Sequence, residues 1–77
     1  MSLGETIRVM RQKAFCTQED FAKALNVALS TVNRWELNKV KPNVKAMKAI
    51  KKFCDENGLP YEDVEEEWLG LSSTGKK

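Results

Sequence analysis

The chain has 77 residues, 42% of them hydrophobic, which suffices for one compact domain that buries roughly 60 to 65% of the surface its unfolded chain exposes. No run approaches the roughly 20 apolar residues of a membrane span, and the N-terminus lacks the basic start and apolar stretch of a secretion signal, so we expect a cytoplasmic protein. The net charge of +2 is divided unevenly, because residues 1–53 hold 11 basic against 4 acidic residues and residues 54–77 hold 2 against 7. A basic body of this kind can face phosphate groups, although lysine-rich helices usually just face water.

The first half of the chain predicts two helices. The first covers residues 3–14, where apolar side chains recur at steps of four, three and four: Leu3, Ile7, Met10 and Ala14. The second covers residues 18–25, because Thr17 offers a hydroxyl to the free N–H groups of a helix and Asp20 follows as in a short capping box. Its apolar face consists of Phe21, Ala22 and Leu25.

A third helix is predicted after a very short turn. Asn26 ends the second helix with a side chain that tolerates a left-handed backbone, and Val27 follows as a buried plug. The third helix covers residues 29–37, with Val32 and Trp35 facing inward at a spacing of three. Four side chains are left for the opposite face: Leu29, Ser30, Asn33 and Arg34.

Two further helices complete the predicted fold. Residues 38–42 form a loop, because Asn38 can stop a helix and Pro42 disfavours helical geometry at the residue before it. Asn43 caps a fourth helix that ends at Asn57-Gly58 and has this apolar stripe: Val44, Met47, Ile50, Phe53 and Cys54. A fifth helix over residues 61–69 is expected to bury Val64, Trp68 and Leu69 and to expose Glu62, Glu65 and Glu66.

No alternating run of apolar and polar residues indicates a strand, so the expected fold is all-α, a bundle of five helices. We expect one domain over residues 1–71 and a flexible tail over residues 72–77. The chemistry argues against an enzyme, because the chain has no histidine, no glycine-rich phosphate loop and no cluster of metal ligands. We therefore expect no cofactor, no metal and no small-molecule ligand.

The two cysteines predict neither a disulfide scaffold nor a zinc finger. Cys16 and Cys54 are far apart in the sequence and no histidine accompanies them, so we interpret both as reduced thiols. Cys54 falls on the apolar stripe of the fourth helix, where a free cysteine packs as a small hydrophobic residue. A redox role for Cys16 stays open.

The predicted second and third helices suit DNA recognition, because two short helices joined by a short turn let the second lie in the roughly 12 Å wide major groove. Residues 17–36 resemble the lambda repressor and Cro-like helix-turn-helix family, also called the xenobiotic-response-element family, and the resemblance covers residues 4 to about 70. The matched positions are Gln18, Phe21, Ala22, Val27, Thr31, Val32, Trp35, Glu36 and Pro42. The resemblance implies a prokaryotic or phage transcriptional regulator, most simply a repressor, that binds double-stranded DNA.

Three positions depart from the family pattern. Asn26 and Asn38 replace the two usual glycines, which is tolerable because asparagine reaches the left-handed backbone more easily than other non-glycine residues. Ala28 replaces the serine that commonly caps the third helix. Because a lost hydroxyl cap typically costs about 1 kcal/mol, we expect this helix to start later, with Ser30 as its cap, or to fray at its first turn.

The resemblance assigns the base-reading role by position. The groove-facing residues are Leu29, Ser30, Asn33 and Arg34. Arg34 has the geometry for a bidentate contact to guanine, Asn33 can read adenine or bond a phosphate, and Leu29 can pack on a thymine methyl group. A simple exposed helical charge is the alternative for Arg34.

The remaining assigned roles are support roles. Gln18 resembles the family's glutamine that bonds a phosphate oxygen, helped by the positive end of its helix, with an exposed first-turn residue as the alternative. The phosphate-facing cations implied around the loop are Lys39, Lys41 and Lys45, any one of which can equally be a solvated charge. Arg11 and Glu36 occupy family positions that pair across the bundle, so they are assigned to structure.

A second interpretation keeps the fold without DNA binding, as a protein-interaction module such as an antitoxin or a bridging factor. The acidic C-terminal segment leaves this open, whereas Arg34 and the basic loop favour DNA. Lambda-like relatives usually bind as dimers on inverted half-sites about one helical turn apart, so a homodimer is also expected. Its candidate surface is Leu59, Tyr61, Trp68 and Leu71, with Trp68 equally suited to the core.

Overall fold

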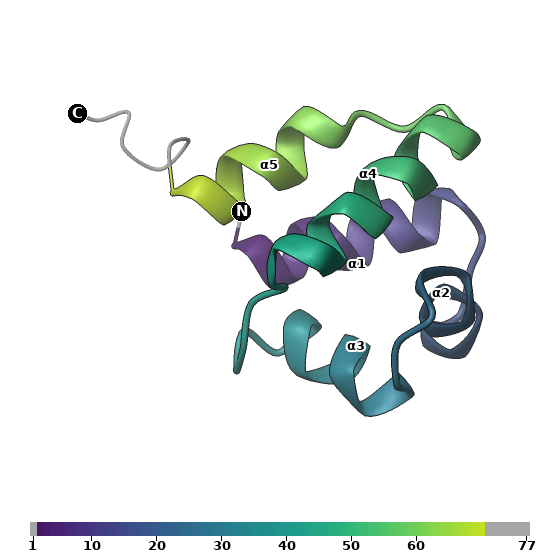
Figure 1. Cartoon of the computed structure of the whole chain (residues 1–77), viewed down its shortest axis with the longest axis horizontal. Helices are drawn as coiled ribbons and strands as arrows, with labels where there is room; N and C mark the ends of the chain where they lie inside the picture. The colour runs from purple at the N-terminus through teal and green to yellow at the C-terminus, as the bar shows by residue number, and fades with distance from the viewer. Residues whose placement is uncertain (1, 71–77) are drawn as a thin grey trace.

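The computed structural model describes residues 2–70, and within them the chain folds into five α-helices. Their bounds are α1 Leu3–Lys13, α2 Gln18–Leu25, α3 Leu29–Glu36, α4 Val44–Asn57 and α5 Tyr61–Leu69. Figure 1 shows α1 and α4 crossing the middle of the molecule, with α5 on one side of them and α3 on the other. The all-α prediction is confirmed, and the predicted helix bounds differ from these by one residue at the ends of α1 and α3.

One hydrophobic core joins all five helices. Its fully buried side chains include one from each helix: Ile7, Phe21, Val32, Ile50 and Val64. The rings of Phe21 and Phe53 meet edge to face with their centroids 5.0 Å apart, which adds a directional contact between α2 and α4. Because α3 contributes Val32 and Trp35 to this core, its orientation is set by packing against α1 and α2.

The burial pattern departs from the prediction at two apolar residues. Val44 was expected on the buried stripe of α4 and Leu69 on that of α5, but they are 59% and 51% exposed. Both lie at a helix terminus, where no neighbouring helix covers the side that the periodicity selects. Trp68 is partly buried against the core. Leu71 and residues 72–77 lie outside the described residues.

All five helices end in a left-handed residue, Gly70 for α5, and the same hydrogen-bond pattern follows the other four. Asn26 and Asn38 have φ angles of 59° and 60°, as predicted, and Gly58 has 65°. Phe15, with φ 58°, ends α1 in the same way, and this was not predicted because phenylalanine rarely adopts this conformation. After each of these residues, the next N–H donates to the carbonyl five residues earlier, which closes the helix.

Side-chain caps start three of the helices. The hydroxyl of Thr17 accepts from the N–H of Asp20 at 3.0 Å, and Asn43 accepts from Ala46 at 2.8 Å, so both predicted caps are confirmed. Ser2 caps α1 in a box with Glu5, which was not predicted. Hydrogen bonds from the Ser2 backbone and hydroxyl lower the pKa of the Glu5 carboxyl.

Cys54 is fully buried among the core residues, and its thiol lies 3.0 Å from the Met10 sulfur. Burial, together with the nearby charges of Asp55 and Glu62, raises the pKa of this thiol to about 11. Cys54 is therefore a packing residue, as predicted.

Among residues 2–70, none of the helices is long and apolar enough to cross a membrane.

Candidate nucleic-acid interface

The two faces of α3 differ sharply in exposure. Val32 and Trp35 are 0% and 3% exposed, whereas Ser30, Asn33 and Arg34 are exposed and Leu29 is 49% exposed. The four residues predicted to read bases therefore share the outer side of one short helix. We call this group, Leu29, Ser30, Asn33 and Arg34, the reading face. Its side chains offer amide, hydroxyl, guanidinium and apolar groups, which are the groups that contact base edges in the major groove.

The reading face begins without a side-chain cap. Ala28 is the N-cap of α3, with an extended backbone, and no side chain accepts from the free N–H groups of the first turn. The helix nevertheless starts at Leu29, so the expectation of a later start capped by Ser30 is wrong. The Ala28 carbonyl accepts from the N–H of Thr31 at 3.0 Å, which closes the first turn tightly.

A buried carboxylate anchors α3 to the two preceding helices. The Glu36 side chain is 4% exposed and accepts from Nε of Arg11 at 2.7 Å and from Nη2 at 3.1 Å. Its Oε1 also accepts from the Gln18 amide at 3.0 Å. Nη1 of the same guanidinium donates to the Cys16 carbonyl at 2.8 Å. This two-pronged pairing of a guanidinium with a carboxylate fixes the angle of α3 relative to α1 and α2.

Gln18 is thus held by one of its two amide hydrogens. Within residues 2–70 the second hydrogen of this amide nitrogen makes no hydrogen bond, so it can donate to a ligand such as a phosphate oxygen. Gln18 is the first residue of α2, where the helix dipole favours anions. The bond to Glu36 therefore orients the predicted phosphate contact at the same time as it supports α3.

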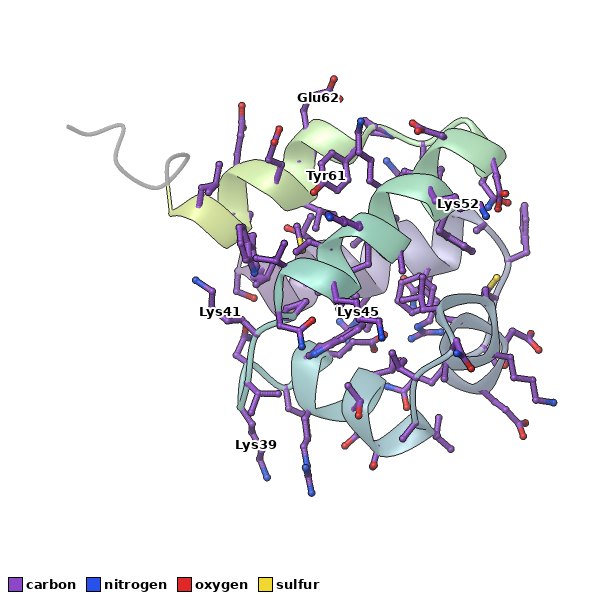
Figure 2. The ribbon with its side chains drawn as sticks, viewed as in Figure 1. Lys39, Lys41, Lys45, Lys52, Tyr61 and Glu62 are labelled. Atoms are coloured by element: carbon purple, nitrogen blue, oxygen red, sulfur yellow. The ribbon has the colours of Figure 1, made fainter. Side chains whose placement is uncertain are left out.

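The loop from Leu37 to Asn43 leaves α3 beside the reading face. Asn38 ties it to the start of α1, since its Oδ1 accepts from the Gly4 N–H at 2.9 Å and its Nδ2 donates to the Ser2 hydroxyl at 3.1 Å. Lys39 follows directly and is exposed. In Figure 2 its side chain extends away from the body of the fold, beside α3.

The three predicted phosphate-facing lysines have different surroundings. The ammonium group of Lys41 donates to the Trp68 carbonyl at 3.0 Å and lies 5.3 Å from the centroid of the Trp68 ring, so it is engaged with the end of α5. Lys45 is exposed on the first turns of α4, on the face that Figure 2 turns to the viewer. Within the part of the chain that the structure describes, the Lys39 and Lys45 side chains make no hydrogen bond or ion pair, so they can meet a phosphate, whereas a contact by Lys41 requires its bond to Trp68 to open.

Sequence reasoning missed the residues that hold this loop. Trp68 donates its indole N–H to the Pro42 carbonyl and accepts from Lys41, so α5 binds the end of the loop at two residues. Gly4 gave no signal in the periodicity of α1, although a Cβ there would lie 2.6 Å from the carbonyl oxygens of both Trp35 and Glu36. The steps of four, three and four residues in α1 show which face is buried but not that another backbone passes this close.

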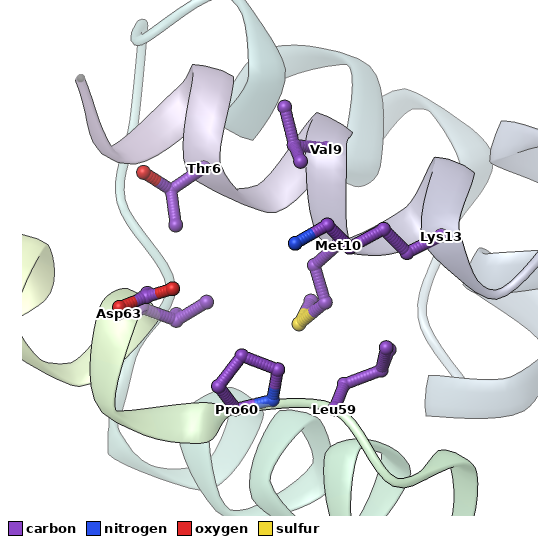
Figure 3. Close-up of a pocket in the computed structure, with 8 residues that line it drawn as sticks. Thr6, Val9, Met10, Lys13, Leu59, Pro60 and Asp63 are labelled. Atoms are coloured by element: carbon purple, nitrogen blue, oxygen red, sulfur yellow. The ribbon is translucent and has the colours of Figure 1, made fainter.

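Figure 3 shows a pocket between α1 and α5, lined by apolar side chains and by Lys13 and Asp63. Its volume is about 50 Å³. Sites for small organic ligands are usually several hundred Å³, so this pocket does not suit one. Among residues 2–70, no group of three or more acidic or cysteine side chains could hold a metal ion.

The arrangement of a buried inner face, an exposed reading face and a preceding helix joined by a tight turn is matched by a known protein family. A model described as helix-turn-helix matches residues 7–61. The chain belongs to this helix-turn-helix family. The match covers all of α2 to α4, so the predicted resemblance is confirmed. Membership in the family supports DNA binding in transcription regulation.

One curated relative of this helix-turn-helix chain is the HTH-type transcriptional activator BcrR of Enterococcus faecalis, which is 34% identical over 53 residues. That alignment covers 69% of the chain and 26% of the relative, so the chain spans about a quarter of the length of this relative. No solved structure matches the chain significantly.

Proposed function

We propose that this helix-turn-helix chain binds double-stranded DNA sequence-specifically, with the reading face of α3 in the major groove. The observation that carries the proposal is the division of α3, whose core residues are buried while Ser30, Asn33 and Arg34 are exposed together. Trp35, at 3% exposure, and the bonds to Glu36 hold the helix rigidly enough to present these side chains in one geometry. Preorganisation of this kind raises specificity because fewer groups must be ordered on binding.

The proposed phosphate contacts come from α2, from the loop after α3 and from α4. Gln18 lies at the start of α2, and Lys39 and Lys45 lie on the loop and the first turns of α4. Each phosphate neutralised by a lysine lowers the slope of log affinity against log salt by about 0.9, so these two lysines contribute about −1.8 per bound copy. Lys41 adds to the slope only if its bond to the Trp68 carbonyl opens on DNA.

The proposal is tested by selecting bound sequences from random duplex DNA and then titrating salt on the selected duplex. We expect one sequence motif to be enriched and its affinity to fall steeply with salt. If no duplex binds, or if binding does not respond to salt, the alternative of a protein-interaction module that keeps this fold is favoured instead.

We further propose that the output is repression by occupancy of the bound site, in a prokaryotic or phage regulator. The curated relative carries the name of an activator, so the output needs a direct test. A reporter with the selected site placed over the promoter, and a second with the site upstream of it, distinguish the two outputs. Repression lowers expression from the first reporter, whereas increased expression from the second would contradict our proposal.

Two copies on inverted half-sites are also proposed. Three residues of the predicted dimer surface, Leu59, Tyr61 and Trp68, are partly buried against the core of their own chain, so only part of each side chain is left for a partner. Leu69, next to Trp68, is the large hydrophobic side chain that α5 exposes. Sedimentation equilibrium with and without the selected duplex measures the stoichiometry, and one copy on a duplex that contains an inverted repeat would contradict the dimer.

A further inference from the structure

We propose that Asn38 is a positioning residue for DNA binding, whose side chain holds the loop after α3 so that Lys39 faces the phosphate backbone. This inference rests on the proposed function. It concerns a residue that stands where a glycine would satisfy the backbone.

The turn itself needs only the backbone of residue 38. Its φ is 60°, its N–H donates to the Trp35 carbonyl at 3.0 Å, and the next N–H donates to Arg34 at 3.0 Å. These bonds close α3, and glycine reaches this conformation at no steric cost. The Asn38 side chain is therefore not required to make the turn.

The side chain instead joins α1 to the loop. Gly4 lies in the first turn of α1, where backbone N–H groups have no partner within the helix, and Asn38 Oδ1 accepts from its N–H. The Asn38 amide also donates to the hydroxyl of Ser2, which is the N-cap of α1. Asn38 thus acts as a second cap for α1 from a position 34 residues away along the chain.

Gly4 is the counterpart that permits this contact. A Cβ at residue 4 would lie 2.6 Å from the carbonyl oxygens of Trp35 and Glu36 and 2.9 Å from Asn38 Oδ1. The start of α1 therefore reaches the end of α3 only because residue 4 has no side chain. The loop is fixed at this end by Asn38 and at the other end by Trp68, which binds Lys41 and Pro42. Between the two ties, Lys39 points outward.

Asn26 is a natural control for this role. It has the same left-handed backbone, with φ 59°, and the N–H of Val27 donates to the Ala22 carbonyl at 2.9 Å in the same closing pattern. Unlike Asn38, however, its side chain makes no hydrogen bond to any residue between 2 and 70. Asn26→Gly thus makes the same chemical change in the same backbone conformation without cutting a tie between elements.

The test is a double-mutant cycle of Asn38→Gly with Lys39→Ala, read out as DNA affinity over a range of salt, with Asn26→Gly alongside. Lys39→Ala alone is expected to make the slope of log affinity against log salt shallower by about 0.9. From about 1 M to about 0.1 M salt, the affinity of the wild type therefore rises about eightfold more than that of this variant. Asn38→Gly is expected to remove a large part of the same slope, and Lys39→Ala is expected to add little to it. Asn26→Gly is expected to keep the full slope.

A loss of stability alone cannot produce this pattern, because the slope is measured where every variant is folded, as checked by circular dichroism. Amide exchange at Gly4 gives a reading without DNA, and it is expected to accelerate in Asn38→Gly and not in Asn26→Gly. A wild-type slope in Asn38→Gly, or a full additional effect of Lys39→Ala on that variant, would overturn the inference alone. A wild-type chain whose DNA binding does not respond to salt would overturn the proposed function together with it.

Discussion

Replacing Glu36 by glutamine is expected to remove a large part of the stability of this domain. The carboxylate is 4% exposed and accepts three hydrogen bonds, while the Arg11 side chain that it neutralises is 12% exposed. Glutamine keeps the size but turns an amide N–H₂ group toward donors and leaves the guanidinium charge without a partner. Breaking one side of a buried ion pair costs about 3 to 5 kcal/mol, against a total of about 4 to 12 kcal/mol for a domain of this length.

Urea unfolding followed by circular dichroism measures this loss. With an m value of about 1 to 1.5 kcal/mol per molar urea, a loss of about 3 kcal/mol moves the midpoint down by about 2 to 3 M. The control is Glu19→Gln, which neutralises one side of an exposed pair in which Lys23 is 4.0 Å away and both side chains are mostly in solvent. That variant is expected to lose less than about 0.5 kcal/mol.

A paired variant separates the charge from the packing. Arg11→Met combined with Glu36→Leu removes both charges at once, so no buried charge is left alone, and it is expected to recover most of the stability lost by Glu36→Gln. The same variant removes the partner of Gln18 and is expected to weaken DNA binding. If the free energy of unfolding of Glu36→Gln lies within about 1 kcal/mol of the wild-type value, the buried network does not anchor α3.

Three further substitutions and one labelling experiment have defined outcomes. Ala28→Ser supplies the cap missing from α3 and is expected to raise the melting temperature by about 4 to 8 °C, equivalent to about 1 kcal/mol. Thr17→Ala removes the cap of α2 and is expected to lower the melting temperature by a similar amount. An unchanged melting temperature in Ala28→Ser would show that the first turn of α3 needs no cap. Phe15→Asn places a residue that tolerates the left-handed conformation at a position whose side chain is 95% exposed, so it is expected to raise the free energy of unfolding by about 1 kcal/mol. A lower free energy of unfolding would mean that the Phe15 ring makes stabilising contacts. At pH 8, iodoacetamide is expected to modify the partly exposed Cys16 in the folded protein and to reach Cys54 only after unfolding. The reason is that a pKa of about 11 leaves Cys54 almost entirely as the unreactive thiol. Equal rates of modification of the two cysteines, followed by mass spectrometry, would contradict this.

Most of the fold was predictable because its signals are local. The caps at Thr17 and Asn43 and the left-handed Asn26 are each set by a residue and its near neighbours, so periodicity and capping rules find them. The left-handed backbone of Phe15 was not predicted, because phenylalanine disfavours the conformation that the closing hydrogen bonds impose. The exposure of Leu69 was not predicted, because periodicity identifies the apolar side of a helix but not whether a neighbouring helix covers its last residue.

The candidate site was predictable on α3 and much less so around it. The reading face follows from which residues of α3 are left after Val32 and Trp35 turn inward. The surroundings of Lys41 and Asn38, by contrast, depend on contacts with residues 27 and 34 to 36 positions away. No local rule shows that the end of α5 and the start of α1 meet the same loop.

If α3 reads base pairs, loss of the Arg34 guanidinium removes discrimination at one position of the bound DNA. Affinity is measured for wild type and Arg34→Ala on the selected duplex and on variants changed at one base pair at a time, with Arg8→Ala on the exposed side of α1 as the control. Wild type and the control are expected to discriminate by about 1 to 3 kcal/mol at the base pair that Arg34 contacts, and Arg34→Ala is expected to lose discrimination there while keeping it elsewhere. An Arg34→Ala variant that weakens binding to every duplex equally, with its preferences intact, would contradict the claim.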